Sequence, residues 1–192
     1  MDSFKKIKED VLDCKRCSLR KEREKKCYLP VAGEGNLKAK ILIVGEAPGL
    51  KEAESGKPFQ GRAGKILDEL MESVRMERKN VYITNILKDR PPGNRNPERR
   101  EIKSCAPFLD RQIRLIKPKA ILLLGNFSAR HVFERCGLEF CGISKARARA
   151  YEARFGKAKV KLIPLYHPAA ATYNPNLKRL MKSDFKKIMK HL

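Results

Sequence analysis

The chain has 192 residues, enough for one domain with a substantial core that needs no disulfides. Its 44 Lys and Arg against 22 Asp and Glu give a formal charge of +22, which favours a polyanionic partner such as nucleic acid, although heat-adapted proteins also carry Lys-rich surfaces. No stretch reaches the roughly 20 apolar residues of a membrane span, and the N-terminus lacks a signal-peptide core. We expect a single cytoplasmic domain over residues 1–192, without membrane contact.

Apolar periodicity predicts helices and strands that alternate along the chain. In chain order they are a helix at 3–13, a strand at 41–44, a helix at 62–75, a strand at 81–84, a helix at 97–116 with Asn96 as its cap, a strand at 120–124, a helix at 126–135, a strand at 159–165 and a helix at 177–190. The basic stretch 136–157 is expected to be a flexible, exposed insertion. Alternation of this kind predicts an α/β fold, a three-layer α/β/α sandwich around a central four-stranded parallel sheet.

Polar loops directly follow three of the expected strands. Glu46 follows the first strand, Asn85 ends the second and His167 follows the fourth. Because parallel strands present their carboxyl ends at one edge of a sheet, where ligands bind in such folds, these side chains should converge on one pocket.

The six cysteines are unlikely to form structural disulfides in the cytoplasm. Cys14-x-x-Cys17 has the spacing of two ligands of one metal ion or cluster, but by itself is half a site. Further ligands could come from Cys105, Cys27, Cys136 or Cys141, and burial as small apolar groups is the alternative for each.

Six motifs, in the same order along the chain, resemble those of the family-four uracil-DNA glycosylases, the iron–sulfur branch of that superfamily. They are Cys14-x-x-Cys17, GEAPG at 45–49, GKPFQGRAG at 56–64, TNILKDRPPGNRNP at 84–97, Cys105 and YHPAA at 166–170. The resemblance covers residues 14–178 and is weak only over 127–158.

The resemblance implies a [4Fe-4S] cluster with a structural role, held by four cysteines. Cys14, Cys17 and Cys105 match three ligand positions, whereas the fourth is Asp89. A carboxylate can bind iron but is a harder ligand than thiolate and holds a cluster less firmly. Three interpretations stay open: Asp89 is the fourth ligand, Cys27 replaces it, or the cluster is labile or absent.

The chemistry of uracil recognition assigns roles in the pocket. By resemblance, Phe59 stacks on the extruded base. Asn85 can separate uracil from cytosine, because a carboxamide both donates and accepts hydrogen bonds. Glu52 matches the family's residue that excludes the 5-methyl group of thymine, but the Asp that normally follows is Ala53 here.

Two residues are expected to act on the bond itself. His167 can donate to uracil O2, where negative charge develops as the bond breaks. Ala47 occupies the position at which some uracil glycosylases place a water-activating aspartate, so that position holds no base. Glu46 is the nearest carboxylate, and we expect it to orient or polarise the attacking water, or to fix its loop.

Further residues are expected to contact DNA. The segment 169–176 resembles the loop that enters the minor groove, and Tyr173 could fill the gap left by the base. Basic candidates for phosphate contacts are Arg90, Arg95, Lys178 and Arg179. The expected partner is DNA containing uracil, bound by a monomer, and the sequence leaves open whether a sliding clamp docks.

These features predict a monofunctional DNA glycosylase that hydrolyses the N-glycosidic bond of uracil in DNA, as in base excision repair of deaminated cytosine. Two alternatives remain: a glycosylase of the same scaffold acting on another damaged base such as hypoxanthine, and a non-catalytic iron–sulfur module that binds nucleic acid.

Overall fold

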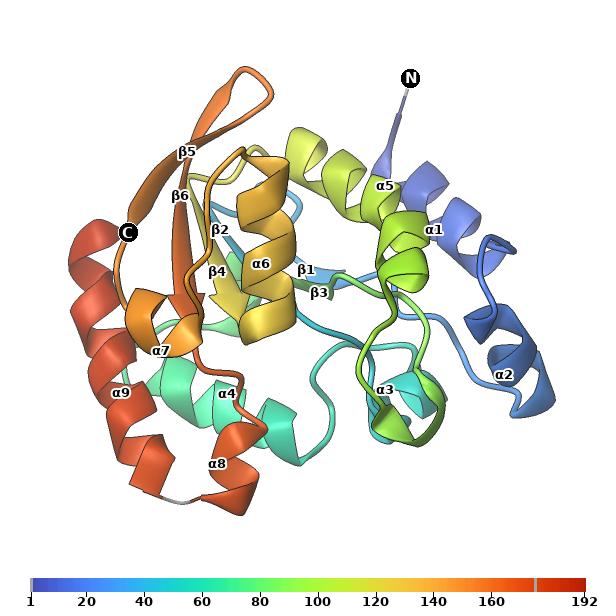
Figure 1. The fold of residues 1–192 in the computed structure, drawn as a ribbon, viewed down its shortest axis with the longest axis horizontal. Coiled ribbons are helices and arrows are strands. Elements are labelled where there is room, and N and C mark those ends of the chain that lie inside the picture. Colours follow the sequence, from blue (N-terminus) through green and yellow to red (C-terminus); the bar gives the residue numbers. More distant parts are fainter. Residues whose placement is uncertain (1, 175) are drawn as a thin grey trace.

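The computed structural model describes residues 2–174 and 176–192 and contains a central sheet with helices on both faces (Figure 1). The six-stranded sheet has the order β1-β3-β2-β4-β6-β5. Its strands are β1 (Glu34–Gly35), β2 (Ile41–Gly45), β3 (Val81–Asn85), β4 (Ala120–Leu124), β5 (Tyr151–Phe155) and β6 (Ala158–Leu165). Neighbouring strands among β3, β2, β4 and β6 pair in parallel, while β1 and β5 pair antiparallel at the two edges.

The five helices expected from the sequence are present, and the described residues form four shorter ones that were not expected. They are α1 (Phe4–Leu12), α2 (Leu19–Lys25), α3 (Leu50–Ser55), α4 (Arg62–Glu72), α5 (Arg99–Ile116), α6 (Asn126–Arg135), α7 (Ile143–Ala146), α8 (Ala170–Tyr173) and α9 (Asn176–Ile188). Helices α4 and α9 cover one face of the sheet, and α5 and α6 cover the other (Figure 1). The predicted α/β sandwich is confirmed.

The two central strands, β2 and β4, are apolar at every position because both of their faces are covered. In β2, Ile43 packs into the core beneath α4 and α9, while its neighbours Leu42 and Val44 pack into the core beneath α5 and α6. Successive side chains of a strand point to opposite faces, so a strand between two helical layers has no polar side.

The prediction of four strands was incomplete. The four parallel strands are present, but two antiparallel edge strands were missed. Strand β1 has two residues, too few to give a periodic signal. Strand β5 lies in the segment 136–157, which was wrongly expected to be a flexible, exposed insertion: Ile143, Ala146 and Phe155 are buried there.

The start of α5 also differs from the prediction. Asn96 was expected to cap a helix beginning at Pro97, whereas the helix begins at Arg99 with Glu98 as its cap. Glu98 and Glu101 form a reciprocal capping box, which satisfies two backbone N–H groups of the first turn.

Among the residues that the structure describes, no helix is both long enough and apolar enough to cross a membrane. The segment 169–176 forms α8 and the start of α9, except that Pro175, like Met1, lies outside the described residues.

Candidate active site

A hollow of about 680 Å³ lies where β2, β3 and β6 end. Six residues selected from the sequence line it: Glu46, Ala47, Glu52, Phe59, Asn85 and His167. Hydrogen bonds continue beyond the paired strands, since the backbone N–H groups of Ile86 and Leu87 donate to the carbonyls of Gly45 and Glu46. This extension fixes the loop after β2 against the loop after β3.

Gly45 brings Asn85 and Phe59 together. A Cβ atom at Gly45 would lie 2.3 Å from Oδ1 of Asn85 and 2.8 Å from Cζ of Phe59. Asn85 is 2% exposed, and its Oδ1 has no hydrogen-bond partner among the described residues. A buried carbonyl oxygen without a partner is costly, and at a functional site it indicates a group held ready for a ligand.

His167 lies beside the ring of Phe59, with ring centroids 5.7 Å apart and planes 27° apart. The backbone N–H of Ala169 donates to Nδ1 of His167 at 3.2 Å. Burial lowers the pKa of His167 to about 4, so the imidazole is neutral at physiological pH. Because Nδ1 accepts a hydrogen bond, the proton of the neutral ring is on Nε2.

Gly125 allows the strand β4 terminus to approach this histidine. Its φ is +91°, and a Cβ atom there would lie 3.2 Å from the Cβ of His167. A side chain at this position would be strained by its backbone angle and crowded by the imidazole.

The loop that carries Phe59 is held in an unusual conformation. Phe59 has a φ of +54°, a left-handed conformation that non-glycine residues rarely adopt. Arg78 donates from Nη2 to the carbonyl of Phe59 at 2.7 Å and from Nη1 to the carbonyl of Pro58 at 3.3 Å. Gly64 of α4 approaches so closely that a Cβ there would lie 1.9 Å from the same Phe59 carbonyl.

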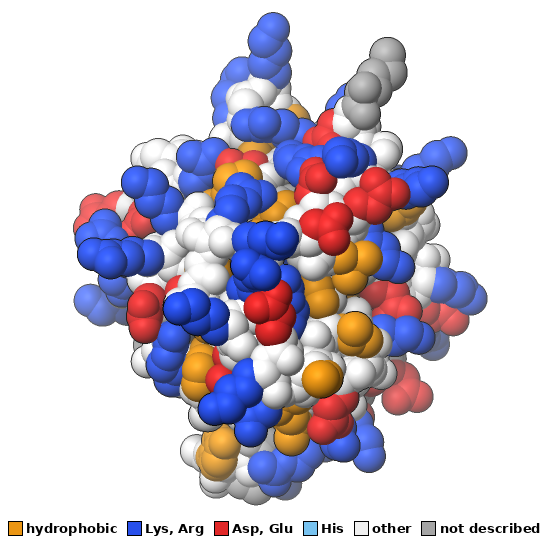
Figure 2. All heavy atoms as spheres, turned by 90° about the vertical axis from the view of Figure 1, so that its right-hand side faces the viewer, with side chains coloured by type: hydrophobic (Ala, Val, Ile, Leu, Met, Phe, Trp, Pro, Cys, Tyr) orange, Lys and Arg blue, Asp and Glu red, His pale blue; other side chains and the backbone are white. Residues whose placement is uncertain are grey.

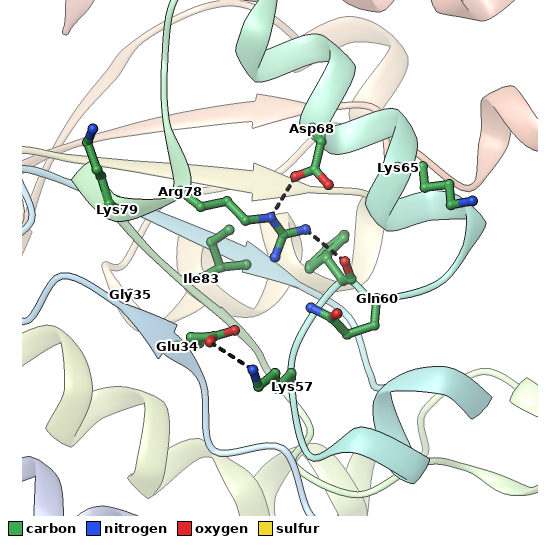
Figure 3. Close-up of a pocket in the computed structure, with 10 residues that line it drawn as sticks. Glu34, Gly35, Lys57, Gln60, Lys65, Asp68, Arg78, Lys79 and Ile83 are labelled. Atoms are coloured by element: carbon green, nitrogen blue, oxygen red, sulfur yellow. Dashed lines mark hydrogen bonds and ion pairs between the residues drawn. The ribbon is translucent and has the colours of Figure 1, made fainter.

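Arg78 lines a second hollow of about 430 Å³, which Phe59 also lines (Figure 3). Its Nε donates to Asp68 of α4 at 2.6 Å, and Figure 3 shows the guanidinium extending from Asp68 toward the loop of Gln60. Phe59 is therefore a lining residue of both hollows.

Glu52 is engaged by the same loop. Its Oε1 accepts hydrogen bonds from the backbone N–H of Gln60 at 3.1 Å and of Gly61 at 3.4 Å. The carboxylate of Glu52 therefore holds the loop segment that directly follows Phe59. Exclusion of the thymine methyl by Glu52 stays a prediction, and this geometry gives the side chain a second role.

Glu46 is half-buried on the wall of the hollow, and burial raises the pKa of its carboxyl group. A raised pKa makes a carboxylate a stronger base than its exposed counterpart.

The residues expected to contact DNA differ in whether their side chains are already engaged in contacts within the protein. Tyr173 is 84% exposed at the rim of the hollow. Arg95 also lines the hollow, but its guanidinium binds both carboxylate oxygens of Glu101. Lys178 pairs with Glu69, whereas Arg90 lies over the ring of Tyr28. The charges of Arg95 and Lys178 are thus already compensated within the protein.

The net positive charge is not gathered in one patch on the face over α1, α2 and α5. Figure 2 shows Lys and Arg side chains on this face interspersed with Asp and Glu.

The residues expected to hold an iron–sulfur cluster are divided among different environments. Cys14 packs against the cluster of Ile7, Val11 and Phe108, whereas Cys17 and Cys105 pack together near Leu19 and Leu87. Asp89 forms an ion pair with Arg23. Within residues 2–174 and 176–192 no three or more His, Cys, Asp or Glu side chains are arranged to hold a metal ion.

Burial also affects the thiols of this region. It raises the pKa of Cys105 to about 12 and also raises that of Cys17. Cys27, the alternative ligand, is exposed after α2. The donor set in this structure does not fit the cluster implied by the resemblance.

Sequence reasoning missed the buried Lys88. Its Nζ donates to Oγ1 of Thr84 at 2.7 Å, to the backbone carbonyl of Asn85 at 2.8 Å and to Oε1 of Gln112 at 3.0 Å. Burial lowers the pKa of this lysine to about 7. Lys88 therefore supports Asn85, and Arg78 supports Phe59. In a chain so rich in Lys and Arg, no local sequence pattern distinguishes these two cations from the others.

Known proteins resemble this chain over nearly its whole length. The sequence profile of the uracil DNA glycosylase superfamily matches residues 32–192. A type-4 uracil-DNA glycosylase of Sulfurisphaera tokodaii is 47% identical, over 98% of this chain and 84% of the relative. One from Archaeoglobus fulgidus is 46% identical, over 98% and 92%, and one from Thermotoga maritima is 37% identical, over 94% and 90%.

Proposed function

The chain belongs to the uracil DNA glycosylase superfamily, and from this premise we propose that it hydrolyses the N-glycosidic bond between uracil and deoxyribose in DNA. The observation that carries the proposal is the buried Oδ1 of Asn85, which has no hydrogen-bond partner among the residues that the structure describes, on a residue that lines the same hollow as Phe59 and His167. The product is free uracil and an abasic site.

Asn85 selects the base. Uracil has an N–H at position 3 and a carbonyl at position 4, so Oδ1 accepts from the first and Nδ2 donates to the second. Cytosine has the opposite pattern at both positions. A polar site that hydrogen-bonds its substrate can reject an analogue with mismatched groups by orders of magnitude, because the buried groups then stay unpaired.

Phe59 supports the extruded base. Extrusion costs a few kcal/mol of lost stacking and pairing. Stacking on an aromatic ring returns about 1 to 3 kcal/mol per base. The rigid loop conformation imposed by Arg78, Glu52 and Gly64 supports this role, since a ring fixed before binding loses little entropy on binding.

His167 stabilises the leaving group. As the bond from C1′ to N1 breaks, its electron pair moves onto the uracil ring and negative charge grows on O2. The neutral imidazole donates from Nε2–H to that oxygen, while Nδ1 is held by the N–H of Ala169. Low pKa favours this neutral form, so no proton has to be lost before reaction.

Glu46 acts on the water. The oxygen of water bonds to C1′, and the released proton passes to the carboxylate of Glu46. Its place in the hollow and its raised pKa support this assignment. Ala47 leaves the neighbouring position without a basic group.

Tyr173 is the exposed side chain best placed to occupy the space vacated in the duplex.

The experiment compares single-turnover excision from labelled oligonucleotides that carry U opposite G, U opposite A, hypoxanthine, or T opposite G, with abasic sites cleaved by alkali. We expect product from both uracil substrates and none from T opposite G. Asn85→Asp, which loses the donor to O4, should lower uracil excision by about 10²- to 10³-fold. Product from hypoxanthine alone would indicate another specificity, and product from no substrate would indicate a binding module.

A further inference from the structure

A single guanidinium connects three segments of the chain near the expected cluster site. Arg23 of α2 donates from Nη1 to both carboxylate oxygens of Asp89, at 3.1 Å each. It also donates from Nη2 to the backbone carbonyl of Cys14 at 2.9 Å. The segment after α1, helix α2 and the loop after β3 are therefore joined by one side chain.

This ion pair is buried. The side chain of Arg23 is 10% exposed and that of Asp89 is 7% exposed. Two buried charges in contact compensate each other, but removal of one leaves the other without a partner in a poorly solvated place. Neither residue can be withdrawn from the pair without such a penalty.

Binding of iron by Asp89 would compete with this ion pair. Both of its oxygens accept hydrogen bonds from the guanidinium, so a shift of the carboxylate toward a metal would weaken the pairing with Arg23. The remaining donors do not complete a site, since among the described residues no three or more His, Cys, Asp or Glu side chains are arranged to hold a metal ion. The segments that a cluster would link are already linked.

We propose that the Arg23–Asp89 ion pair takes the place of an iron–sulfur cluster in this chain, and that the protein folds without a metal. The carboxylate at position 89 then has an electrostatic role, with α2 supplying its partner. This proposal concerns folding, so it stands or falls independently of the proposed reaction.

The first test measures metal content. The full-length protein is produced with iron supplementation, purified without oxygen, and treated with ferrous iron and sulfide under reducing conditions before desalting. We expect iron and acid-labile sulfide far below the stoichiometry of a cluster, and no broad visible absorption from thiolate-bound iron. A cluster stoichiometric with the chain, before or after reconstitution, would overturn the proposal.

The second test measures the melting temperature. Arg23→Gln should lower it by roughly 6 to 20 °C, because Asp89 loses its buried partner. Arg20→Gln is the matched control, since Arg20 lies on the same helix and pairs with Glu24 near the surface. That change should lower the melting temperature by no more than about 2 °C.

A double variant separates the ion pair from general damage to α2. Arg23→Gln combined with Asp89→Asn removes both charges, so it should melt above Arg23→Gln alone. An iron chelator should leave the melting temperature of the unaltered protein unchanged. Equal melting of Arg23→Gln and Arg20→Gln, or destabilisation by the chelator, would contradict the proposal.

Discussion

Gly45 lies directly against the amide of Asn85, so closely that a methyl group on its Cα would come within 2.3 Å of Oδ1. The same methyl group would contact the ring of Phe59 at 2.8 Å. The absence of a side chain at Gly45 therefore leaves the space in which the amide of Asn85 and the ring of Phe59 lie close together. Position 45 at the end of β2 therefore requires glycine because of the space that a side chain would fill, and not because of the backbone conformation.

Gly45→Ala should reduce uracil excision sharply, because the amide and the ring must both move away from the methyl group. We expect a loss of about 10²-fold or more in single-turnover rate, as misplacement of a substrate-binding group by about 1 Å has such an effect. A thermal melt serves as the control, since it separates displacement within the hollow from unfolding. An alanine variant that is folded and fully active would show that the two side chains need not be in these positions.

Arg78 should act on the reaction through Phe59. Arg78→Gln removes the hydrogen bonds to the carbonyls of Pro58 and Phe59, so the left-handed conformation of Phe59 loses support. Asp68→Asn is the matched control, because it removes only the ion pair with Nε of the guanidinium. We expect excision by Arg78→Gln to fall about tenfold, chiefly through a higher KM, and that of Asp68→Asn to stay within about twofold.

Fluorine NMR of a labelled Phe59 ring offers a second readout for the same pair of variants. The ring signal should shift or broaden in Arg78→Gln and stay unchanged in Asp68→Asn. If both variants gave the signal of the unaltered protein while activity fell, Arg78 would act by another route.

The parallel core of the fold was readable from the sequence because its strands are short, largely apolar runs that alternate with amphipathic helices. The edge strand β5 was not, although Tyr151, Ala153 and Phe155 alternate with Glu152 and Arg154. Surrounding charges concealed that alternation. It becomes visible only once the inward side chains are seen to pack against α6 and β6.

The convergence of Glu46, Asn85 and His167 on one hollow followed from the loops that end three strands, a consequence of topology. The supporting contacts did not follow, because they join residues distant in sequence: Arg23 meets Asp89 across 66 positions and Arg78 meets Phe59 across 19. In a chain with 44 Lys and Arg residues, nothing local marks which cations are buried. The expected metal ligands could not be judged from the sequence for the same reason. Their spacing does not reveal that the guanidinium of Arg23 pairs with Asp89.

Glu46 should determine the acidic side of the pH profile for excision. Its active form is the carboxylate, and burial raises the pKa of that group. As the pH is lowered, activity should therefore begin to fall at a higher pH than it would with an exposed glutamate. Glu46→Gln should lower the rate by about 10²-fold and remove this limb of the profile. Full single-turnover activity of Glu46→Gln would end the assignment, and a slower variant with an unchanged limb would transfer the titration to another group.

His167 should make the stability of the protein depend on pH. Its pKa in the folded state is about 4, against 6.5 for an unperturbed histidine. Between these values the unfolded chain binds a proton that the folded chain does not, so the free energy of unfolding decreases as the pH falls, by at most about 3 kcal/mol. His167→Asn lacks the titrating ring yet keeps an acceptor for the N–H of Ala169, so its stability should fall less over the same range. Urea denaturation of both proteins at several pH values measures the difference, and parallel curves would show that the imidazole is not held neutral by its surroundings.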